Sequence, residues 1–375
     1  MTDKLSRLLE TTLVLSEQFQ SALSAPPAKA DTNTNTSDSK KPPEPLQLLS
    51  TSATALRSHV TKLSLLAINT PFTPSALSTV LSAVNDSVLP SLVTAALLVT
   101  PDEHTKAFAA EVRVLTRTVL REFSSLVEEV RNIAKKKNER DEELAQSEKD
   151  VVTTATGRVW DACDSLTQLV GKGVVGFVVR RVEEWRDLVK DAIDELAEWD
   201  PDEEEDDFDD NLLDGDDDGD DDANGTKNDT QDKDETATAA LHAQKKSTLR
   251  VLKPIGQIYP AIISNRLKKG GLTASDSSAS STLPPRAHIP KLESLTSDLQ
   301  AIPGYIDEAA GSLYESNLAN SVLYLRKAKE SAERAMRLVT FPWGGEPEED
   351  KLTTWSRTWL KVMDEVMSEV NRNES

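Results

Sequence analysis

A dense run of carboxylates divides this chain and limits what it can fold into. Residues 200–222 hold 16 Asp and Glu side chains and no Lys or Arg. The formal net charge is −21, so only about −5 belongs to the rest of the chain. Like charges at this density repel one another, and the run has little apolar surface to offset the entropy of ordering. We therefore predict a disordered acidic tether with folded sequence on both sides.

Outside this run, apolar residues recur at helical spacing in almost every long segment. Aromatic residues make up only 5% of the chain, and no segment alternates apolar and polar residues as a half-buried strand would. The sequence therefore predicts an all-α fold of two up-and-down helical bundles joined by the disordered acidic tether. The clearest stripe consists of Phe108, Val112, Leu115, Val119, Phe123, Leu126, Val130 and Ile133.

Changes in composition place the domain boundaries. We predict an N-terminal helical bundle over residues 1–199, a disordered acidic linker over residues 200–238 and a C-terminal helical bundle over residues 239–375. The first bundle carries a flexible insert rich in Pro, Ser, Thr and Asn at residues 25–45, and the second a flexible linker rich in Ser and Gly at residues 270–287.

Prolines predict helix breaks in the C-terminal bundle, because proline cannot donate the intrahelical hydrogen bond. Pro254 and Pro260 are expected to interrupt the helical segment at residues 241–269. Residues 289–302 are expected to form a short helix of their own, followed by a separate long helix whose stripe runs from residue 306 to residue 339.

Composition also bears on the compartment and on the classes of partner. A lone cysteine, Cys163, allows no internal disulfide and favours a reducing environment. The N-terminus lacks the apolar core of a signal peptide, and the longest apolar stretch, residues 88–99, is too short to span a bilayer. We expect a soluble cytoplasmic and nuclear protein that binds no membrane and no nucleic acid directly, since its acidity repels phosphates.

No motif in the sequence supports catalysis, a cofactor or a metal ion. Gly171, Gly173 and Gly176 match the dinucleotide pattern G-x-G-x-x-G, but a helical segment precedes them where the motif needs a strand. Residues 214–219 imitate half of a calcium loop and lack its closing Glu. The four histidines are far apart in sequence and form no ligand pattern: His59, His104, His242 and His288.

Three further features are explained by solvated helix ends or by core packing, and we favour these explanations over functional ones. The basic clusters at residues 135–137 and 266–269 are interpreted as solvated helix ends, with nuclear signals as the alternative. Trp160 and Cys163 are predicted to be core residues, the thiol buried and inert. Trp355 and Trp359, four residues apart on one face of the last helical segment, are predicted to pack in a core, with an interface as the alternative.

Residues 157–166, which read Gly-Arg-Val-Trp-Asp-Ala-Cys-Asp-Ser-Leu, resemble the cyclin-D-binding protein family. The similarity continues through residues 187–196, and the acidic run that follows also fits. The insert at residues 25–45 and the length of the acidic run depart from the family pattern. The family consists of helical regulators, also described as helix-loop-helix proteins that lack a DNA-contacting basic region.

The resemblance implies two all-helical bundles similar to those of the talin rod and its vinculin-like relatives. It also implies a non-enzymatic role, in which the protein binds cyclin D or other helical regulators and restrains cell-cycle progression. The family offers no catalytic residues to carry over.

We therefore expect a non-enzymatic adaptor or regulator, connected with the cell cycle or transcription, that binds partner helices in grooves of its bundles. One alternative is a cytoskeletal talin- or vinculin-like adaptor. Another is an acidic chaperone of basic proteins such as histones, which the carboxylate run favours. No cofactor, metal or small-molecule substrate is expected. The carboxylates predicted to bind a partner are Asp202, Glu203, Glu204, Glu205, Asp206, Asp207, Asp216, Asp217 and Asp218.

Overall fold

A computed structural model describes most of the chain: residues 2–25, 44–139, 143–202, 228–269, 284, 286–343 and 349–373. Over these residues the protein forms helices and no β-strand. Most of the predicted insert at residues 25–45, residues 203–227 of the predicted tether and most of the linker at residues 270–287 lie outside the described residues.

The chain forms two compact units, which confirms the prediction of an all-α fold with two helical bundles. The first unit comprises Met1–Phe177 with Thr273–Pro290, and the second comprises Val178–Leu272 with Lys291–Ser375. The division therefore lies inside a helix rather than at residue 199, where we had placed it. That helix, α7 (Gln146–Glu198), contains one non-helical residue shortly before the division, Gly173, with φ 63° and ψ −172°. Gly173 and the division both fall between the apolar stripe that ends at Leu169 and the stripe that begins at Val178.

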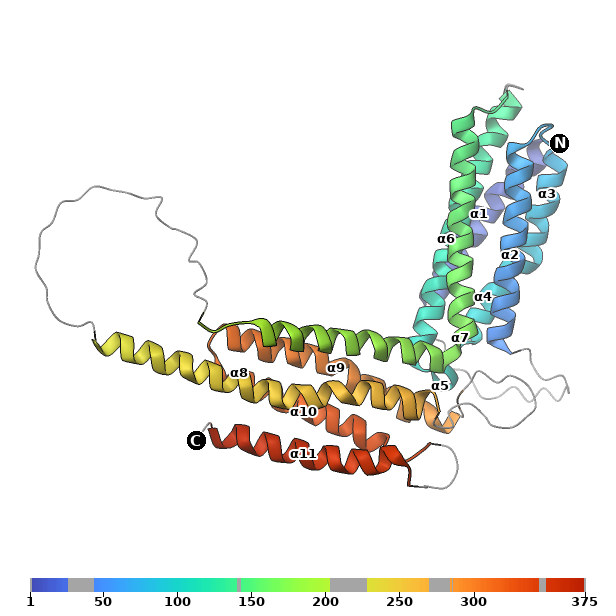
Figure 1. The fold of residues 1–375 in the computed structure, drawn as a ribbon. Helices are drawn as coiled ribbons and strands as arrows, with labels where there is room; N and C mark the ends of the chain where they lie inside the picture. The colour runs from blue at the N-terminus through green and yellow to red at the C-terminus, as the bar shows by residue number, and fades with distance from the viewer. Residues whose placement is uncertain are drawn as a thin grey trace, which may run out of the picture. The chain divides into compact units, whose positions relative to one another are not determined.

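In the first unit, long helices pack side by side around an apolar core (Figure 1). α1 lies along α6, and α2 lies along α3 and α4. The α6 stripe predicted from the sequence faces this core: Phe108, Val112 and Phe123 are fully buried. The elements are α1 (Thr2–Ser24), α2 (Pro45–Ile68), α3 (Pro74–Ala83), the π-turn η1 (Val84–Val88), α4 (Leu89–Leu98), α5 (Pro101–His104), α6 (Lys106–Glu139) and α7 as far as Phe177.

The segment Pro74–Leu98 is one helical run with a widened turn in the middle. In that turn the Leu89 N–H donates to the Val84 carbonyl, five residues back, immediately before Pro90. Pro74–Leu98 and α7 are each long and apolar enough, by length and composition, to cross a membrane. The apolar run is thus longer than residues 88–99. In each of these two segments, half of the most apolar window is buried inside the protein, as in the core helix of a soluble protein. Their length and apolar composition are therefore weak evidence for a membrane span.

In the second unit, α8 packs against both α10 and α11 (Figure 1). Its core includes Tyr259, Leu299 and Met363, all with no exposed surface. The elements are α7 from Val178, α8 (Asn228–Ile262), the π-turn η2 (Ile263–Leu267), α9 (Ile289–Tyr314), α10 (Leu318–Leu338) and α11 (Lys351–Asn373). A short 3-10 turn, η3 (Arg286–His288), precedes α9 and belongs to the first unit, as do Ile289 and Pro290 at the start of that helix.

Several predicted boundaries in the C-terminal half were wrong. α8 begins at Asn228, so residues 228–238 of the predicted linker are helical; the carboxylate run has ended there and alanines follow. α8 also continues through Pro254 and Pro260, and α9 continues through Pro303. The break that we predicted after residue 302 falls instead at residues 315–317, where Ser316 adopts a φ of 58°.

Candidate functional site

The acidic run was the site predicted from the sequence, and only its first member can be placed. Asp202 lies just beyond the end of α7, in the second unit, and is exposed. The remaining predicted carboxylates lie outside the described residues: Glu203, Glu204, Glu205, Asp206, Asp207, Asp216, Asp217 and Asp218.

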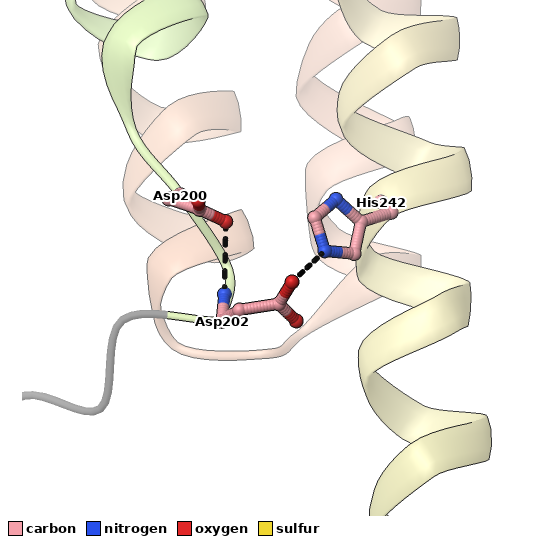
Figure 2. Close-up of side chains that lie close together, drawn as sticks. All are labelled: Asp200, Asp202 and His242. Carbon is pink, nitrogen blue, oxygen red and sulfur yellow. Dashed lines mark hydrogen bonds and ion pairs between the residues drawn. The ribbon is translucent and has the colours of Figure 1, made fainter.

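Asp202 lies beside His242, a histidine that has no candidate ligand partner near it in sequence (Figure 2). The Asp202 Oδ2 and His242 Nε2 atoms are 3.1 Å apart, and the backbone N–H of Asp202 donates to Asp200 Oδ1 at 3.1 Å. His242 comes from α8, and residues 203–241 separate it from Asp202 in sequence. No local spacing could have revealed this contact.

One ligand atom from each of Asp200, Asp202 and His242 lies within 4.8 Å of the other two. Such a group has the chemistry to bind a divalent cation weakly. All three residues are exposed, however, and exposed acidic groups are often arranged like this without an ion. An exposed Asp–His pair also contributes little stability, because water screens it. We therefore assign no metal site here.

The residues that carry the family resemblance form a different surface in the first unit. We define the α2–α7 face as Arg57 of α2 with Trp160 and Asp164 of α7. Arg57 and Asp164 form an ion pair whose side chains are about half exposed. The guanidinium carbon of Arg57 lies 5.5 Å from the centroid of the Trp160 ring, a cation–π arrangement.

Helical spacing explains why these residues meet. Thr156, Trp160 and Asp164 are four residues apart, so they lie along one side of α7. At the buried end of this row, the Thr156 hydroxyl is hydrogen-bonded to the Ser64 hydroxyl of α2. At the other end the row reaches the surface at Asp164. The α2–α7 face is thus the solvent-accessible end of a helix–helix seam.

Trp160 differs from its prediction as a core residue. Its ring is partly exposed beneath Arg57, although its indole nitrogen is buried and has no hydrogen-bond partner among the described residues. Partly exposed Trp and Arg side chains are the types most enriched among residues that dominate binding energy at protein interfaces. The sequence pattern missed this because Trp160 is adjacent to the true core position, Val159, which is fully buried.

Cys163 is buried, as predicted. The pKa of its thiol is raised to about 12, mainly by burial and also by the neighbouring Asp164 carboxylate, while Arg57 opposes the change. The thiolate is the reactive form of cysteine. A thiol with such a pKa remains protonated near neutral pH, which fits the interpretation of an inert side chain.

The glycine pattern lies within α7 and follows a helix, as expected, and no strand occurs in the described part of the chain. Only Gly173 of the three has a positive φ. These glycines therefore lie inside a helix that Gly173 interrupts, and they do not follow a strand as a nucleotide-binding loop would.

Comparison with known proteins supports the resemblance noted at residues 157–166. Residues 48–202 match the family model described as "Grap2 and cyclin-D-interacting, N-terminal". This stretch of the chain is similar to the N-terminal region of the cyclin-D-interacting family. No curated protein matches the chain. The cyclin-D-interacting match runs from α2 to just beyond α7 and includes all three residues of the α2–α7 face.

Proposed function

We propose that this chain is a non-enzymatic adaptor or regulator that acts by binding proteins, among them a D-type cyclin or a helix-loop-helix-type regulator. The observation that carries the proposal is the match of residues 48–202 to the cyclin-D-interacting family. A role in the cell cycle or transcription, in the cytoplasm and nucleus, follows from this proposal. It requires no cofactor and no contact with a membrane or nucleic acid.

The α2–α7 face is the part of the family region that we propose to meet the partner. Arg57 and Asp164 offer opposite charges, and Trp160 offers a partly exposed aromatic ring beneath Arg57. An interface hot spot combines an aromatic or Arg anchor with a polar surround that excludes water. A partner helix lying along the α2–α7 seam would bury Trp160 further. Its own charged side chains would pair with Arg57 and Asp164, which now pair with each other.

The experiment is a binding measurement with full-length protein and a purified D-type cyclin, by isothermal titration calorimetry. Trp160 is partly buried, so we would change the exposed members of the face, as Arg57→Glu and Asp164→Lys. Each should weaken binding by at least about tenfold, as removal of a central interface residue does. Asp86→Lys is the matched control, because Asp86 is an exposed acid of the same unit that lies on η1.

Two results would count against this proposal. If no D-type cyclin binds the wild-type protein at micromolar concentrations, the proposed partner is wrong. If the cyclin binds, and Asp86→Lys weakens it as much as Arg57→Glu does, the partner stands but the α2–α7 face does not. Circular dichroism of each variant checks that the helices remain intact.

The acidic run favours a second candidate function, a chaperone of basic proteins such as histones. Sixteen carboxylates in residues 200–222 would attract such proteins by exposed charge. That attraction should fall steeply as salt rises, since the screening length drops from roughly 30 Å at 0.01 M to about 8 Å at 0.15 M. A variant with the run replaced by Ser and Gly should then lose histone binding and keep cyclin binding.

A further inference from the structure

We propose that a basic pocket in the first unit binds an acidic peptide segment of a partner protein, with an apolar side chain of that segment inside the pocket. The proposal is independent of cyclin binding at the α2–α7 face. The pocket has a volume of about 770 Å³ and opens where α1, the α2–α3 connection and the end of α6 come together.

The floor of this basic pocket is apolar. It is lined by Leu5 and Leu9 of α1, which are buried, and by Pro71, Phe72 and Pro74 of the α2–α3 connection. Phe72 is only partly buried, so a ligand can cover more of its ring. Peptide and small-molecule sites of several hundred Å³ commonly combine such a floor with a few charged groups that fix orientation.

Cations dominate the rim of the basic pocket. Arg131, Lys135 and Lys137 of α6 line it, against one acidic side chain, Glu143. This excess of positive charge occurs in a chain whose net charge is −21. An acidic ligand is repelled by most of such a protein and is attracted to a local cationic concavity. The charge of the pocket therefore selects an anionic partner.

The lysines at residues 135–137 could simply oppose the negative end of the α6 dipole, and their neighbours distinguish the two roles. Lys136 has a structural partner, since its ammonium lies 2.7 Å from Glu148 of α7. Arg131 is paired with Glu128 on its own helix. Lys135 is exposed, lines the basic pocket and forms no ion pair or hydrogen bond within the described part of the chain. Its charge is thus available to a ligand.

An acidic segment with one apolar side chain fits both parts of the site. Its carboxylates would approach Lys135 and Arg131, while the apolar side chain would lie against Phe72 and Leu9. Charge steers the encounter, and burial of apolar surface slows dissociation. A purely acidic peptide would leave the apolar floor exposed to water. A neutral peptide would leave Lys135 without an ionic partner.

The test uses full-length protein and fluorescein-labelled peptides, with binding followed by fluorescence anisotropy. The probe is the hexapeptide Glu-Glu-Leu-Phe-Glu-Glu. Its two controls are Gln-Gln-Leu-Phe-Gln-Gln, which lacks the charge, and Glu-Glu-Ser-Ser-Glu-Glu, which lacks the apolar pair. Only the probe should bind well, and each control should bind at least about tenfold more weakly, because each loses one of the two contributions.

Variants of the protein test whether the peptide binds at the basic pocket. Lys135→Glu should weaken binding of the probe by at least about tenfold, and Lys135→Gln by less, in line with their changes of charge. Lys62→Glu is the matched control, because Lys62 is an exposed lysine of the first unit that does not line the basic pocket. Thermal melting monitored by circular dichroism should show the same stability for all three, since the changed side chains are exposed.

Three outcomes would overturn the proposal. The probe may fail to bind wild-type protein. Lys62→Glu may weaken binding as much as Lys135→Glu does, which would indicate a nonspecific charge effect. Finally, vesicles containing phosphatidylserine may bind the protein in a manner sensitive to Lys135→Glu while the peptide does not bind, which would assign the pocket to a membrane surface.

Discussion

The hydroxyl of Tyr259 in α8 donates a hydrogen bond of 2.9 Å to the backbone carbonyl of Leu299 in α9. This carbonyl would normally accept from the N–H of residue 303, four positions on, but residue 303 is a proline and has no N–H. Both residues are fully buried, so no water replaces the missing donor. The tyrosine therefore satisfies the acceptor that Pro303 leaves open, and α9 continues through the proline.

Tyr259→Phe should destabilise the second unit by about 1–3 kcal/mol, the usual cost of a buried polar group without a partner. In a Pro303→Ala background the new N–H can bond to Leu299, so the same change should cost less than about 1 kcal/mol. Urea unfolding of the four proteins of this cycle measures both values. Equal costs in the two backgrounds would mean that Pro303 is not the reason for the tyrosine contact.

This contact shows why the helix break predicted near residue 302 was wrong. The penalty for a proline in a helix is local and can be read from sequence, whereas the donor that offsets it comes from another helix. The burial of Phe108, Val112 and Phe123 in α6 was predictable, because helical spacing is a local property. Every successful prediction of the fold rests on such local periodicity.

The functional surfaces were harder to predict from the sequence, because they also depend on contacts between distant segments. His242 meets Asp202, and Arg57 covers Trp160, through contacts between segments distant in sequence. The cluster at residues 135–137 was visible as charge. Only the packing of α1 beside α6 shows that Lys135 lines a pocket, and only the contact between α6 and α7 shows that Lys136 binds Glu148.

Arg266 was predicted to be part of a solvated helix end, and it is only 1% exposed. Its Nη1 and Nη2 atoms bind the two carboxylate oxygens of Asp350, at 2.6 and 3.0 Å. The same guanidinium donates to the backbone carbonyls of Val339 and Thr340, at 2.7 and 2.8 Å. Arg266 thereby joins the end of α10 and the start of α11 to η2.

Arg266→Leu should destabilise the second unit by about 2–4 kcal/mol, because it leaves the buried Val339 carbonyl without this donor and the Asp350 carboxylate without its cation. The lower part of this range is favoured by the partial exposure of Asp350. Arg250→Leu is the matched control: Arg250 also lies on α8–η2 and pairs with Glu369, but that pair is about half exposed. It should change stability by less than about 1 kcal/mol. Similar losses for the two variants in urea unfolding would contradict the role given to Arg266.

Asp350 should make the second unit sensitive to acid. The Arg266 guanidinium lowers the pKa of its carboxyl well below the usual 3.8, and hydrogen bonds from Thr353 lower it further. The unfolded carboxyl then binds a proton before the folded one does, so this stability is present above about pH 4 and is lost as the pH falls below it. Asp350→Asn should be less stable than wild type at pH 7 and should lose less stability between about pH 5 and pH 2. A parallel pH profile for the two proteins would refute this assignment.

His104 predicts a separate acid sensitivity in the first unit, at higher pH. The imidazole has no exposed surface, stacks near Phe108 and has both nitrogens buried without a hydrogen-bond partner in the described residues. Burial lowers its pKa below 6.5, although the Thr100 carbonyl opposes the shift. The carboxylates of Glu103 and Glu44 also oppose it.

Because the unfolded imidazole protonates first, stability of the first unit should decline as the pH falls below about 6.5. His104→Phe removes the titrating group and keeps an aromatic ring beside Phe108. It should flatten the stability profile between about pH 7 and pH 5, as measured by thermal melting. A profile unaffected by His104→Phe would show that the decline has another source.

The last prediction concerns two glycines of α7 that lie two residues apart and should respond in opposite directions. Gly173 has φ 63° and ψ −172°, a backbone conformation that is essentially restricted to glycine. Gly171 lies in the helix without a positive φ, and a Cβ added there would meet nothing within 4 Å.

Gly173→Ala should therefore destabilise the protein by about 1–3 kcal/mol through backbone strain. Gly171→Ala should stabilise it by about 0.5–1 kcal/mol, because alanine loses less conformational entropy in a helix. Both variants add one methyl group, at an exposed position for Gly171 and at a buried position for Gly173. Urea unfolding followed by circular dichroism gives the sign of each effect. If both substitutions stabilise the protein, then α7 is a continuous helix at residue 173, and the interruption that we place just before the division between the two units is absent.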